Sequence, residues 1–468
     1  MALKIVYPVC CGIDVHKSFV VACIAATDDK GVTTYKRRRF STFSGDLRLL
    51  AQWLADNGCR DVCMESTGKY WIPVYNMLES SCKVVLAHPK YVKALRGKKT
   101  DARDAKWIAD VFKHDLVSGS FIPPFAIRQL RDLMRYRVKL TSFSVGEKNR
   151  VLNCLTVSNI KLDDVFSDVF GKSASAITEQ LLLHPDGSFD VAPLMDPRCK
   201  ASPAHVQAAI DGLMCPEQAQ KLKIIRSHMD SLELCKTNLE SVIISLAEQF
   251  LPQIELVMTV PGIQLFSAIF IIAEIGVDMS VFPTAKHLCS WAGLVPQNNE
   301  SAGKKKSTRI ARAGAYIKPL LVQCALTVCN SDKHPEIKSR YLALKKRRGH
   351  KKAIIAICRM LLTAIYAILK KSEAYNPNLY RKVASLPANR TLTIEQAVAF
   401  VQRHGFMVVD SDGVIASRPL YIPFSIYCNY VTVPFYAHYP LSLHVVSNLT
   451  LPIFVLKHWW CHSVSEYR

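Results

Sequence analysis

The chain has 468 residues, half of them hydrophobic, which is too long for one compact domain and predicts two or three domains with sizeable cores. Its 60 Lys and Arg residues outnumber 38 Asp and Glu residues, giving a formal net charge of +22. This balance favours an acidic polymer as partner, nucleic acid before an anionic membrane. A basic protein without such a partner is the alternative on charge alone.

The 16 cysteines form no C-x-x-C pair and are scattered through apolar runs. This pattern indicates reduced, buried thiols and argues against disulfides or a zinc site. The N-terminal stretch MALKIVYPVCCGIDVHK has no long apolar core before its first acid, so we expect no secretory signal and a cytoplasmic location.

The first 42 residues predict three strands, over residues 6–15, 18–28 and 31–42. A short break at His16-Lys17 and a polar turn at residues 28–31 separate them. Three successive strands joined by tight turns indicate an antiparallel meander.

Helices and strands then alternate. A leucine stripe from Leu47 to Leu54 predicts a helix that Ser44 caps and that ends at Asn57-Gly58. The stretches CRDVCMES and CKVVLAHP read as strands on either side of a second helical stripe that starts at Trp71. This order is that of an α/β RNase H-like (RuvC-like) domain, in which carboxylates gather at the strand ends.

Four acids are the candidate catalytic residues of this domain. Asp14 and Glu65 each end an apolar strand, and Asp101 and Asp104 share one face of a following helix that Thr100 can cap. Crowded carboxylates repel each other, and hard oxygen ligands favour Mg²⁺ or Mn²⁺. Two such ions about 4 Å apart can stabilise both oxygens of a phosphoryl displacement. Each aspartate alone is explained by helix capping or surface charge, so the prediction rests on the ordered set.

Residues 123–250 read as helical, with Ile225, Leu232 and Leu239 spaced by sevens. The spacing favours a coiled-coil or long-hairpin segment that serves as an assembly surface. An ordinary amphipathic helix in a bundle fits so few heptads equally well.

A mainly α C-terminal region follows. TVPGIQLFSAIFIIAEIG has a Pro-Gly turn before an apolar helix and resembles a helix-hairpin-helix, in which backbone N–H groups near Gly262 hold a DNA phosphate. A simple buried helix is the alternative for this segment.

The block WAGLVPQNNESAGKKKSTRIARAGAYIK places Ser301 in a polar loop followed by a run of cations. A serine flanked by cations can attack a phosphodiester, although Ser307 and Thr308 compete and a loop serine that only contacts phosphate is the simpler reading. A second run, LKKRRGHKK, reads as a phosphate-binding patch or a solvated helix end. The cations expected to contact nucleic acid are Lys304, Lys305, Lys306, Arg309, Arg312, Lys345, Lys346, Arg347, Arg348, Lys351 and Lys352.

The C-terminal stretch of the sequence differs from the rest in composition. Residues 415–468 hold four charged residues among many aromatic residues and prolines, which interrupt each apolar run before a membrane span is reached. Our hypothesis is that this tail is not native, for example after a frameshift. A variant ending at Asp412 should then keep full activity, and loss of folding on that truncation would refute the hypothesis.

Five motifs in order, GIDVHK, MESTGKYW, KTDARDA, TVPGIQ and the Ser301 block, resemble the insertion-sequence 110 family of transposases from about Cys11 to Tyr380. This family is of the DEDD type, with a RuvC-like N-terminal domain and a C-terminal serine domain. The resemblance implies that Asp14, Glu65, Asp101 and Asp104 bind the metal. It makes Ser301, which precedes a small-Gly-Lys triplet, a nucleophile that becomes joined to a DNA phosphate. Ala302 stands in that triplet where many relatives have a second Gly.

The resemblance further implies a composite site from different subunits and a structured guide RNA that pairs with target and donor DNA. We therefore expect a transposase or recombinase of a bacterial insertion sequence that is a dimer or tetramer. Its partners would be double-stranded DNA at element ends and target and a guide RNA, with no membrane. The alternatives are a RuvC-like endonuclease using water and a non-catalytic nucleic-acid-binding protein. The predicted domains are residues 1–122 (catalytic), 123–250 (helical assembly), 251–384 (serine domain) and 385–468 (extension).

Overall fold

The computed structural model describes residues 3–66, 68–88, 101–296, 299–301, 304–307 and 309–377, with only the backbone described at 299–301 and 304–306. The predicted cap at Thr100, the competing hydroxyl of Thr308 and the tail hypothesis therefore lie outside the described residues.

A five-stranded sheet forms the N-terminal domain. Its strands are β1 Val9–Val15, β2 Phe19–Thr27, β3 Thr33–Ser41, β4 Asp61–Glu65 and β5 Lys83–Ala87, in the order β3-β2-β1-β4-β5. The first three strands are antiparallel, whereas β4 runs parallel to β1 and β5 parallel to β4. The predicted meander and the alternation that follows it are both confirmed.

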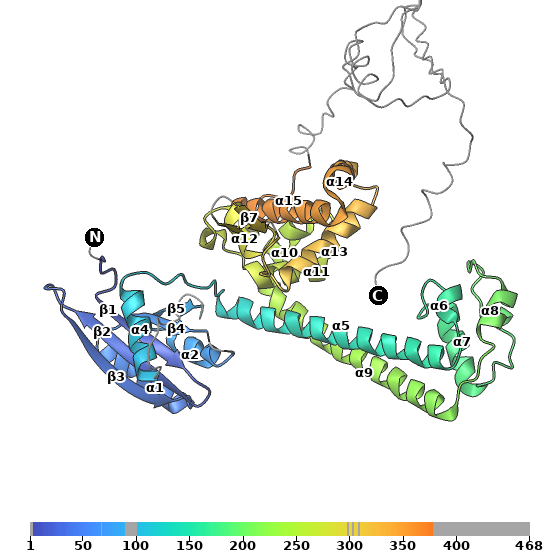
Figure 1. Ribbon diagram of the computed structural model, residues 1–468, viewed down its shortest axis with the longest axis horizontal. Coiled ribbons are helices and arrows are strands. Elements are labelled where there is room, and N and C mark those ends of the chain that lie inside the picture. Colours follow the sequence, from blue (N-terminus) through green and yellow to red (C-terminus); the bar gives the residue numbers. More distant parts are fainter. Residues whose placement is uncertain are drawn as a thin grey trace, which may run out of the picture. The chain divides into compact units, whose positions relative to one another are not determined.

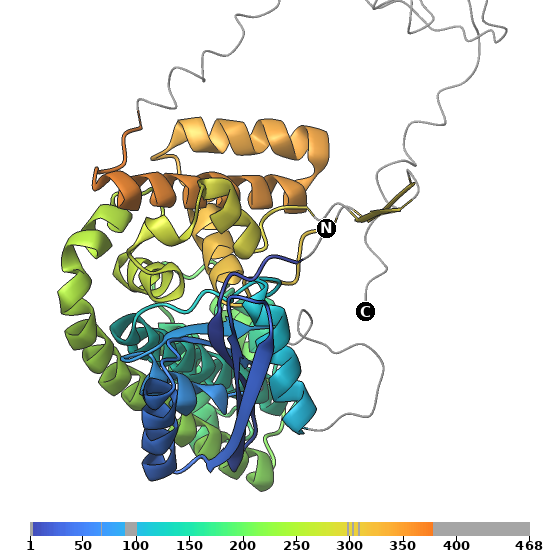
Figure 2. The same cartoon turned by 90° about the vertical axis from the view of Figure 1, so that its left-hand side faces the viewer.

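Helices cover both faces of this sheet (Figure 2). Helices α1 (Ser44–Asp56) and α2 (Trp71–Leu78) bury their apolar stripes on one face, and α4 (Asp101–Lys113) packs on the other. The predicted cap of α1 is wrong. Ser44 is its first helical residue, and Phe43 occupies the capping position without a side-chain hydrogen bond. The predicted end is confirmed, with Asn57 at the C-cap.

Two long helices, α5 (Phe125–Val157) and α9 (Pro216–Ala247), pack side by side (Figure 1). They are antiparallel, because Arg137 pairs with Glu240, whereas Glu147, later on α5, pairs with His228, which is earlier on α9. Ile225 and Leu232 are buried, and Leu239 is partly buried against the core. The long-hairpin interpretation is confirmed within one chain. A small lobe with its own core links the two helices and contains α6 Leu162–Val165, α7 Lys172–Leu183, η1 Ala192–Leu194 and α8 Pro203–Ala209.

The C-terminal region is mainly helical and has the largest core. Helix α11 lies inside this core, and α14 lies along α15 (Figure 2). The elements are η2 Glu248–Phe250, α10 Leu251–Met258, α11 Leu265–Ile275, η3 Met279–Val281, α12 Ala285–Trp291, β6 Asn299–Ser301, β7 Lys304–Ser307, α13 Ile317–Asn330, α14 Pro335–Arg348 and α15 His350–Lys371.

Arginines at the start of α5 attach that helix to its neighbours. Arg135 makes a bidentate ion pair with the buried Glu274 of α11, at 2.8 and 2.9 Å. Arg131 donates to the carbonyl oxygens of Ala273 and Glu274, and burial lowers its pKa to about 10. Arg128 pairs with Glu79 beyond the end of α2. The first turns of α5 thus contact both the sheet domain, through Arg128, and α11, through Arg131 and Arg135.

In the described part of the chain, the helical stretch 216–258 and α15 are long and apolar enough to cross a membrane. Their most apolar windows are 22% and 61% buried, respectively. Helix α15 contributes its apolar side to the C-terminal core, and α9 packs along α5, so each has a role inside the fold. The described cysteines are all free thiols and most are buried, as the sequence predicted.

Candidate metal centre and serine hairpin

Two of the predicted acids lie at one edge of the sheet. Asp14 is near the end of β1 and is only 7% exposed, and Glu65 is the last residue of β4 and is half-buried. The two strands are parallel neighbours with Ile13 opposite Met64. Parallel strands end at the same edge of a sheet, so both residues reach the same side of the domain.

The first turn of α4 supplies the other two acids. Asp101 is exposed and Asp104 half-buried. His16 connects the groups, since its Nε2 lies 3.1 Å from Asp14 Oδ2 and 3.5 Å from Asp101 Oδ1. One ligand atom from each of Asp14, His16 and Asp101 lies within 4.8 Å of the other two. The structure therefore brings Asp14 and Asp101 together, with Asp104 one helical turn further along α4.

Electrostatics at Asp14 favour a cation. Burial raises the pKa of its carboxyl, and the neighbouring charges of Asp104 and Asp101 raise it further, while His16 acts in the opposite direction. A bound cation would relieve this cost, because it compensates the charge that burial and like charges disfavour. The oxygen donors fit a hard divalent ion such as Mg²⁺ or Mn²⁺.

Gly12 determines how closely α4 approaches the sheet. A Cβ atom at this position would lie 2.3 Å from both the carbonyl oxygen of Ala105 and the amide nitrogen of Ala109. Only glycine lets the helix backbone rest directly on β1. Since Gly12 precedes Asp14 by two residues on the same strand face, the contact also sets the distance between Asp14 and the acids of α4.

A polar cluster at the other end of α4 fixes the helix laterally. The Tyr35 hydroxyl of β3 donates to Asp110 Oδ1 at 2.6 Å, and Lys113 Nζ donates to the same oxygen at 3.1 Å and to Thr33 Oγ1 at 3.3 Å. Burial and the hydrogen bond to Asp110 raise the pKa of the Tyr35 hydroxyl well above its usual range. The neutral hydroxyl therefore stays a donor and holds α4 to β3.

Sequence reasoning did not assign His16, although it belongs to the motif GIDVHK. A signal was present, because residues two apart on an extended strand point to the same face, and His16 follows Asp14 by two. Its ring also packs against Phe19, with centroids 4.5 Å apart.

The predicted nucleophile lies in a separate element. Ser301 was expected in a loop, but it is the last residue of β6 and pairs with Lys304 at the start of β7. A bridge between Pro296 and Ile310 extends this antiparallel hairpin toward its base. The local pairing explains the difference, since a short two-stranded hairpin has no long apolar run to reveal it.

Two glycines fix the base of the hairpin. A Cβ at Gly314 would lie 2.2 Å from the carbonyl oxygen of Ala292, and a Cβ at Gly293 would lie 2.6 Å from that of Ala313. Both have positive φ angles, +68° and +67°. The Lys318 ammonium donates to the Ala311 carbonyl at 2.6 Å, and burial lowers its pKa. The two stretches that enter and leave the hairpin are thereby locked together.

Comparison with known proteins agrees with both halves of this architecture. Residues 11–160 match a family model described as a transposase of the DEDD IS110 type, and residues 254–342 match the transposase IS116/IS110/IS902 family. The chain belongs to the IS110 family of transposases. The two matches contain Asp14, Glu65, Asp101 and Asp104 in the first and Ser301 in the second.

Individual relatives of this transposase-family chain are distant. An uncharacterised 43.6 kDa protein of insertion element IS110 from Streptomyces coelicolor is 23% identical over 335 residues, covering 66% of this chain and 81% of the relative. The transposase for insertion sequence element IS1111A from Coxiella burnetii is 30% identical over 122 residues, 25% of this chain and 33% of the relative. The pilin gene-inverting protein of Moraxella bovis is 28% identical over 128 residues, 27% and 39% of the two chains.

The second basic run of this IS110-family chain forms an exposed corner. Lys345, Lys346, Arg347 and Arg348 end α14, and Lys351 and Lys352 begin α15 after Gly349. Cations at the end of α14 are favourable for its dipole, but cations in the first turn of α15 are unfavourable. Helix stability therefore does not explain Lys351 and Lys352. Arg309 and Arg312, after the hairpin, are also exposed.

The Pro-Gly turn at Gly262 has a structural explanation. It joins α10 to α11, and Gly262 has a φ of +79°. A Cβ there would lie 2.3 Å from Val328 Cγ2 and 2.8 Å from the carbonyl oxygen of Cys324, both on α13. Close packing on α13 thus accounts for this glycine, and its predicted contact with a DNA phosphate stays a prediction.

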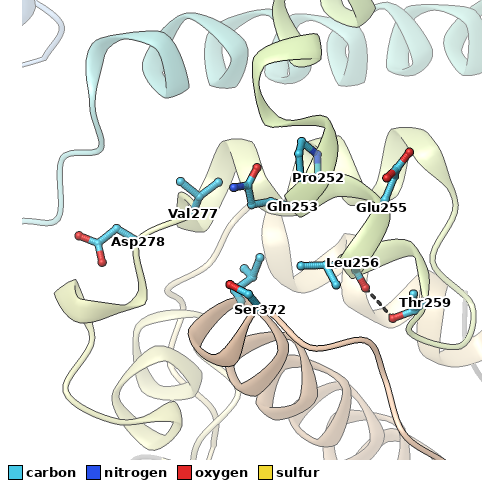
Figure 3. A pocket seen from close by; sticks show the side chains of 9 residues that line it. Pro252, Gln253, Glu255, Leu256, Thr259, Val277, Asp278 and Ser372 are labelled. Carbon is cyan, nitrogen blue, oxygen red and sulfur yellow. Dashed lines mark hydrogen bonds between the residues drawn. The ribbon is translucent and has the colours of Figure 1, made fainter.

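A pocket of about 610 Å³ lies beside α10 and the end of α15, and none of the predicted site residues lines it (Figure 3). Glu255 and Asp278 are its charged lining residues, and Leu256 and Val277 contribute apolar groups. Without a Lys or Arg in its lining, this pocket is unsuited to an acidic polymer.

Proposed function

We propose that this transposase-family protein cleaves and rejoins DNA strands, with Ser301 as nucleophile and a carboxylate-bound Mg²⁺ or Mn²⁺. The observation that supports the proposal best is the convergence of Asp14 and Asp101, with Asp104 beside them, at the sheet edge where Glu65 ends its strand. Burial of Asp14 and its repulsion by Asp101 and Asp104 both cost stability, and a bound cation would offset that cost.

In the proposed reaction the Ser301 hydroxyl attacks a DNA phosphodiester. A bond forms between Ser301 Oγ and phosphorus, the bond to one strand's sugar oxygen breaks, and the serine proton leaves as the sugar oxygen gains one. A sugar hydroxyl of the new strand then attacks the phosphoserine and regenerates Ser301. The divalent ion, when bound, would stabilise negative charge on the phosphoryl oxygens.

The carboxylates Asp14, Glu65, Asp101 and Asp104 would hold that ion, and Gly12 and Tyr35 keep the helix with the last two acids in place. The exposed cations would hold double-stranded DNA through its phosphates, a contact that gives affinity and register without reading sequence.

We further propose that sequence is read by a structured guide RNA. The large excess of cations over acids fits a protein that binds nucleic-acid backbones and leaves base pairing to a nucleic acid. RNA that copurifies with the full chain, expressed with the DNA flanking its gene, should map to a non-coding flank. Copurified RNA drawn at random from the cell would contradict the guide role.

The active unit is proposed to be a dimer or tetramer in which carboxylates and serine come from different subunits. The α5–α9 hairpin is the proposed assembly surface, since it exposes Ile224, Leu234 and Val242 at 62%, 63% and 50%. Leu234→Glu should lower the oligomer mass measured by light scattering. Glu233→Gln, beside it and exposed, is the matched control.

A recombination assay in cells, using the gene with its flanks, tests the serine. Ser301→Ala should abolish recombination while the protein keeps its RNA. Recombination by this variant would overturn the assignment of the nucleophile. Metal-dependent cutting without joining would instead indicate a RuvC-like nuclease that uses water.

Mixing two inactive variants tests the composite site. Co-expressed Ser301→Ala and Asp14→Asn chains should recover part of the activity, because one site of a mixed dimer would keep both an intact serine and intact carboxylates. No recovery despite proven mixed assembly would place both groups in one subunit.

A further inference from the structure

The edge strand β3 carries four consecutive cations, Lys36 to Arg39, and all four are exposed. One explanation is that these charges do no more than prevent the edge strand from pairing with another sheet. In that case the two faces of the strand would be equivalent, and the direction of each side chain would not matter.

The two faces of β3 lie beside different parts of the domain, α4 on one side and α1 on the other. Arg39 lies opposite Val21 of β2, which lies opposite Asp14 of β1. Residues that are directly opposite across a sheet share a face, so Arg39 and, two residues earlier, Arg37 face the α4 side together with Asp14. Lys36 and Arg38 face the α1 side, where Lys36 donates to Asn57 Oδ1 at 2.8 Å.

Aromatic contacts position cations on the α4 side. The Arg39 guanidinium lies 3.7 Å from the centroid of the Phe19 ring, which also packs on His16, the partner of Asp14. Lys106 of α4 lies 4.0 Å from the Tyr35 ring centroid. A guanidinium stacked on a ring loses little further freedom when it binds an anion.

These arginines are not committed to protein carboxylates. The ion pairs among the described residues include neither Arg37 nor Arg39. Their charge is therefore available to an external anion, next to a cluster of acids that by itself repels phosphate.

We propose that Arg37 and Arg39, together with Lys106, bind phosphates of the DNA strand whose reacting phosphate lies at the carboxylates. This inference rests on the proposed function and deepens it by naming a substrate-binding surface. Arg39 is two strands from Asp14, about 10 Å at the usual strand spacing, a distance suited to a phosphate near the reacting one. The cations would offset the repulsion that the acids exert on the approaching strand.

The test measures DNA binding by the full chain with its copurified RNA, as a function of salt, in an Asp14→Asn background that prevents turnover. Arg37→Gln/Arg39→Gln should weaken binding about tenfold for each arginine and reduce the salt slope by about 2. Lys36→Gln/Arg38→Gln is the matched control, with the same charge change on the same strand but the opposite face. It should shift affinity less than twofold.

Equal losses in both double variants would overturn the proposal, since they would show a general charge effect. So would unchanged binding in the first variant, or a loss confined to RNA retention. Arg37→Lys/Arg39→Lys should restore the salt slope, which a folding defect would not allow. Binding does not depend on Ser301, so the result stands apart from failure of the strand-exchange mechanism.

Discussion

The carboxylate site and the serine hairpin are built in contrasting ways. Asp14, Glu65 and the acids of α4 come from three elements spread over about ninety residues and meet only through tertiary packing. Ser301 instead belongs to a hairpin whose strands are adjacent in sequence and whose base is locked by Gly293 and Gly314. A site assembled from distant elements depends on residues that never touch substrate, whereas a local site depends mainly on its own side chains.

The largest effect is expected at the centre of the packed site. Asp14→Asn should reduce recombination by at least about 10²-fold, because the proposed metal ion would be lost and with it several kcal/mol of charge stabilisation. Recombination in cells is the measurement. Asp29→Asn, in the exposed turn after β2, is the control and should leave activity unchanged.

A packing residue sharpens the contrast. Gly12→Ala should cost about 1–3 kcal/mol of stability and lower Mg²⁺ affinity, because the added methyl would push α4 away from β1. Thermal unfolding and metal titration of the purified chain measure the two effects. Gly45→Ala, in α1 with nothing within 4 Å of the new methyl, should be neutral or stabilising. Unchanged metal affinity in the Gly12 variant would contradict the dependence on α4.

Removing one hydrogen bond at the far end of α4 tests the same dependence more gently. Tyr35→Phe should cost about 1 kcal/mol, because Asp110 keeps its contact with Lys113 but loses the tyrosine hydroxyl. Denaturant unfolding measures the change. Tyr136→Phe, exposed on α5, is the control. Equal small effects in both variants would show that Tyr35 does not hold the helix.

The smallest effect concerns metal-free stability. The folded-state pKa of Asp14 is raised, so the folded protein binds a proton there more readily than the unfolded chain, and stability falls as pH rises through that range. At neutral pH in EDTA, Asp14→Asn should therefore melt at a higher temperature than the wild type. Excess Mg²⁺ at 100 times its Kd should stabilise only the wild type, by about 2.7 kcal/mol. A lower melting temperature for the variant in EDTA would refute the stated cost of the ionised carboxylate.

The same contrast explains how much the sequence could predict. The three strands of the meander and the leucine stripe of α1 follow from local patterns, and both are confirmed. Asp14 and Asp101 could be paired only by assuming the fold, since nothing local links them. The hairpin at Ser301 and the role of His16 were missed, because short strands and single residues carry little periodic signal.

Two glycines also show that local sequence patterns do not reveal tertiary contacts. Gly12 lies in a strand, as predicted, and Gly262 was read as part of a phosphate-binding turn. Neither prediction revealed that another helix approaches the backbone closely at each of these glycines. Gly12 meets residues about one hundred positions away, and Gly262 meets residues about sixty positions away. Contacts over such distances leave no trace in the local spacing of residue types.

The most direct test of the account is a search for a covalent protein–DNA adduct, after expression of the chain with its native flanks. Denatured complexes would be digested and the DNA-linked peptide identified by mass spectrometry, with Ser301→Ala and Asp14→Asn in parallel. The account predicts an adduct on the peptide containing Ser301 in the wild type and none in either variant. An adduct on another residue, or recombination without any adduct, would contradict it.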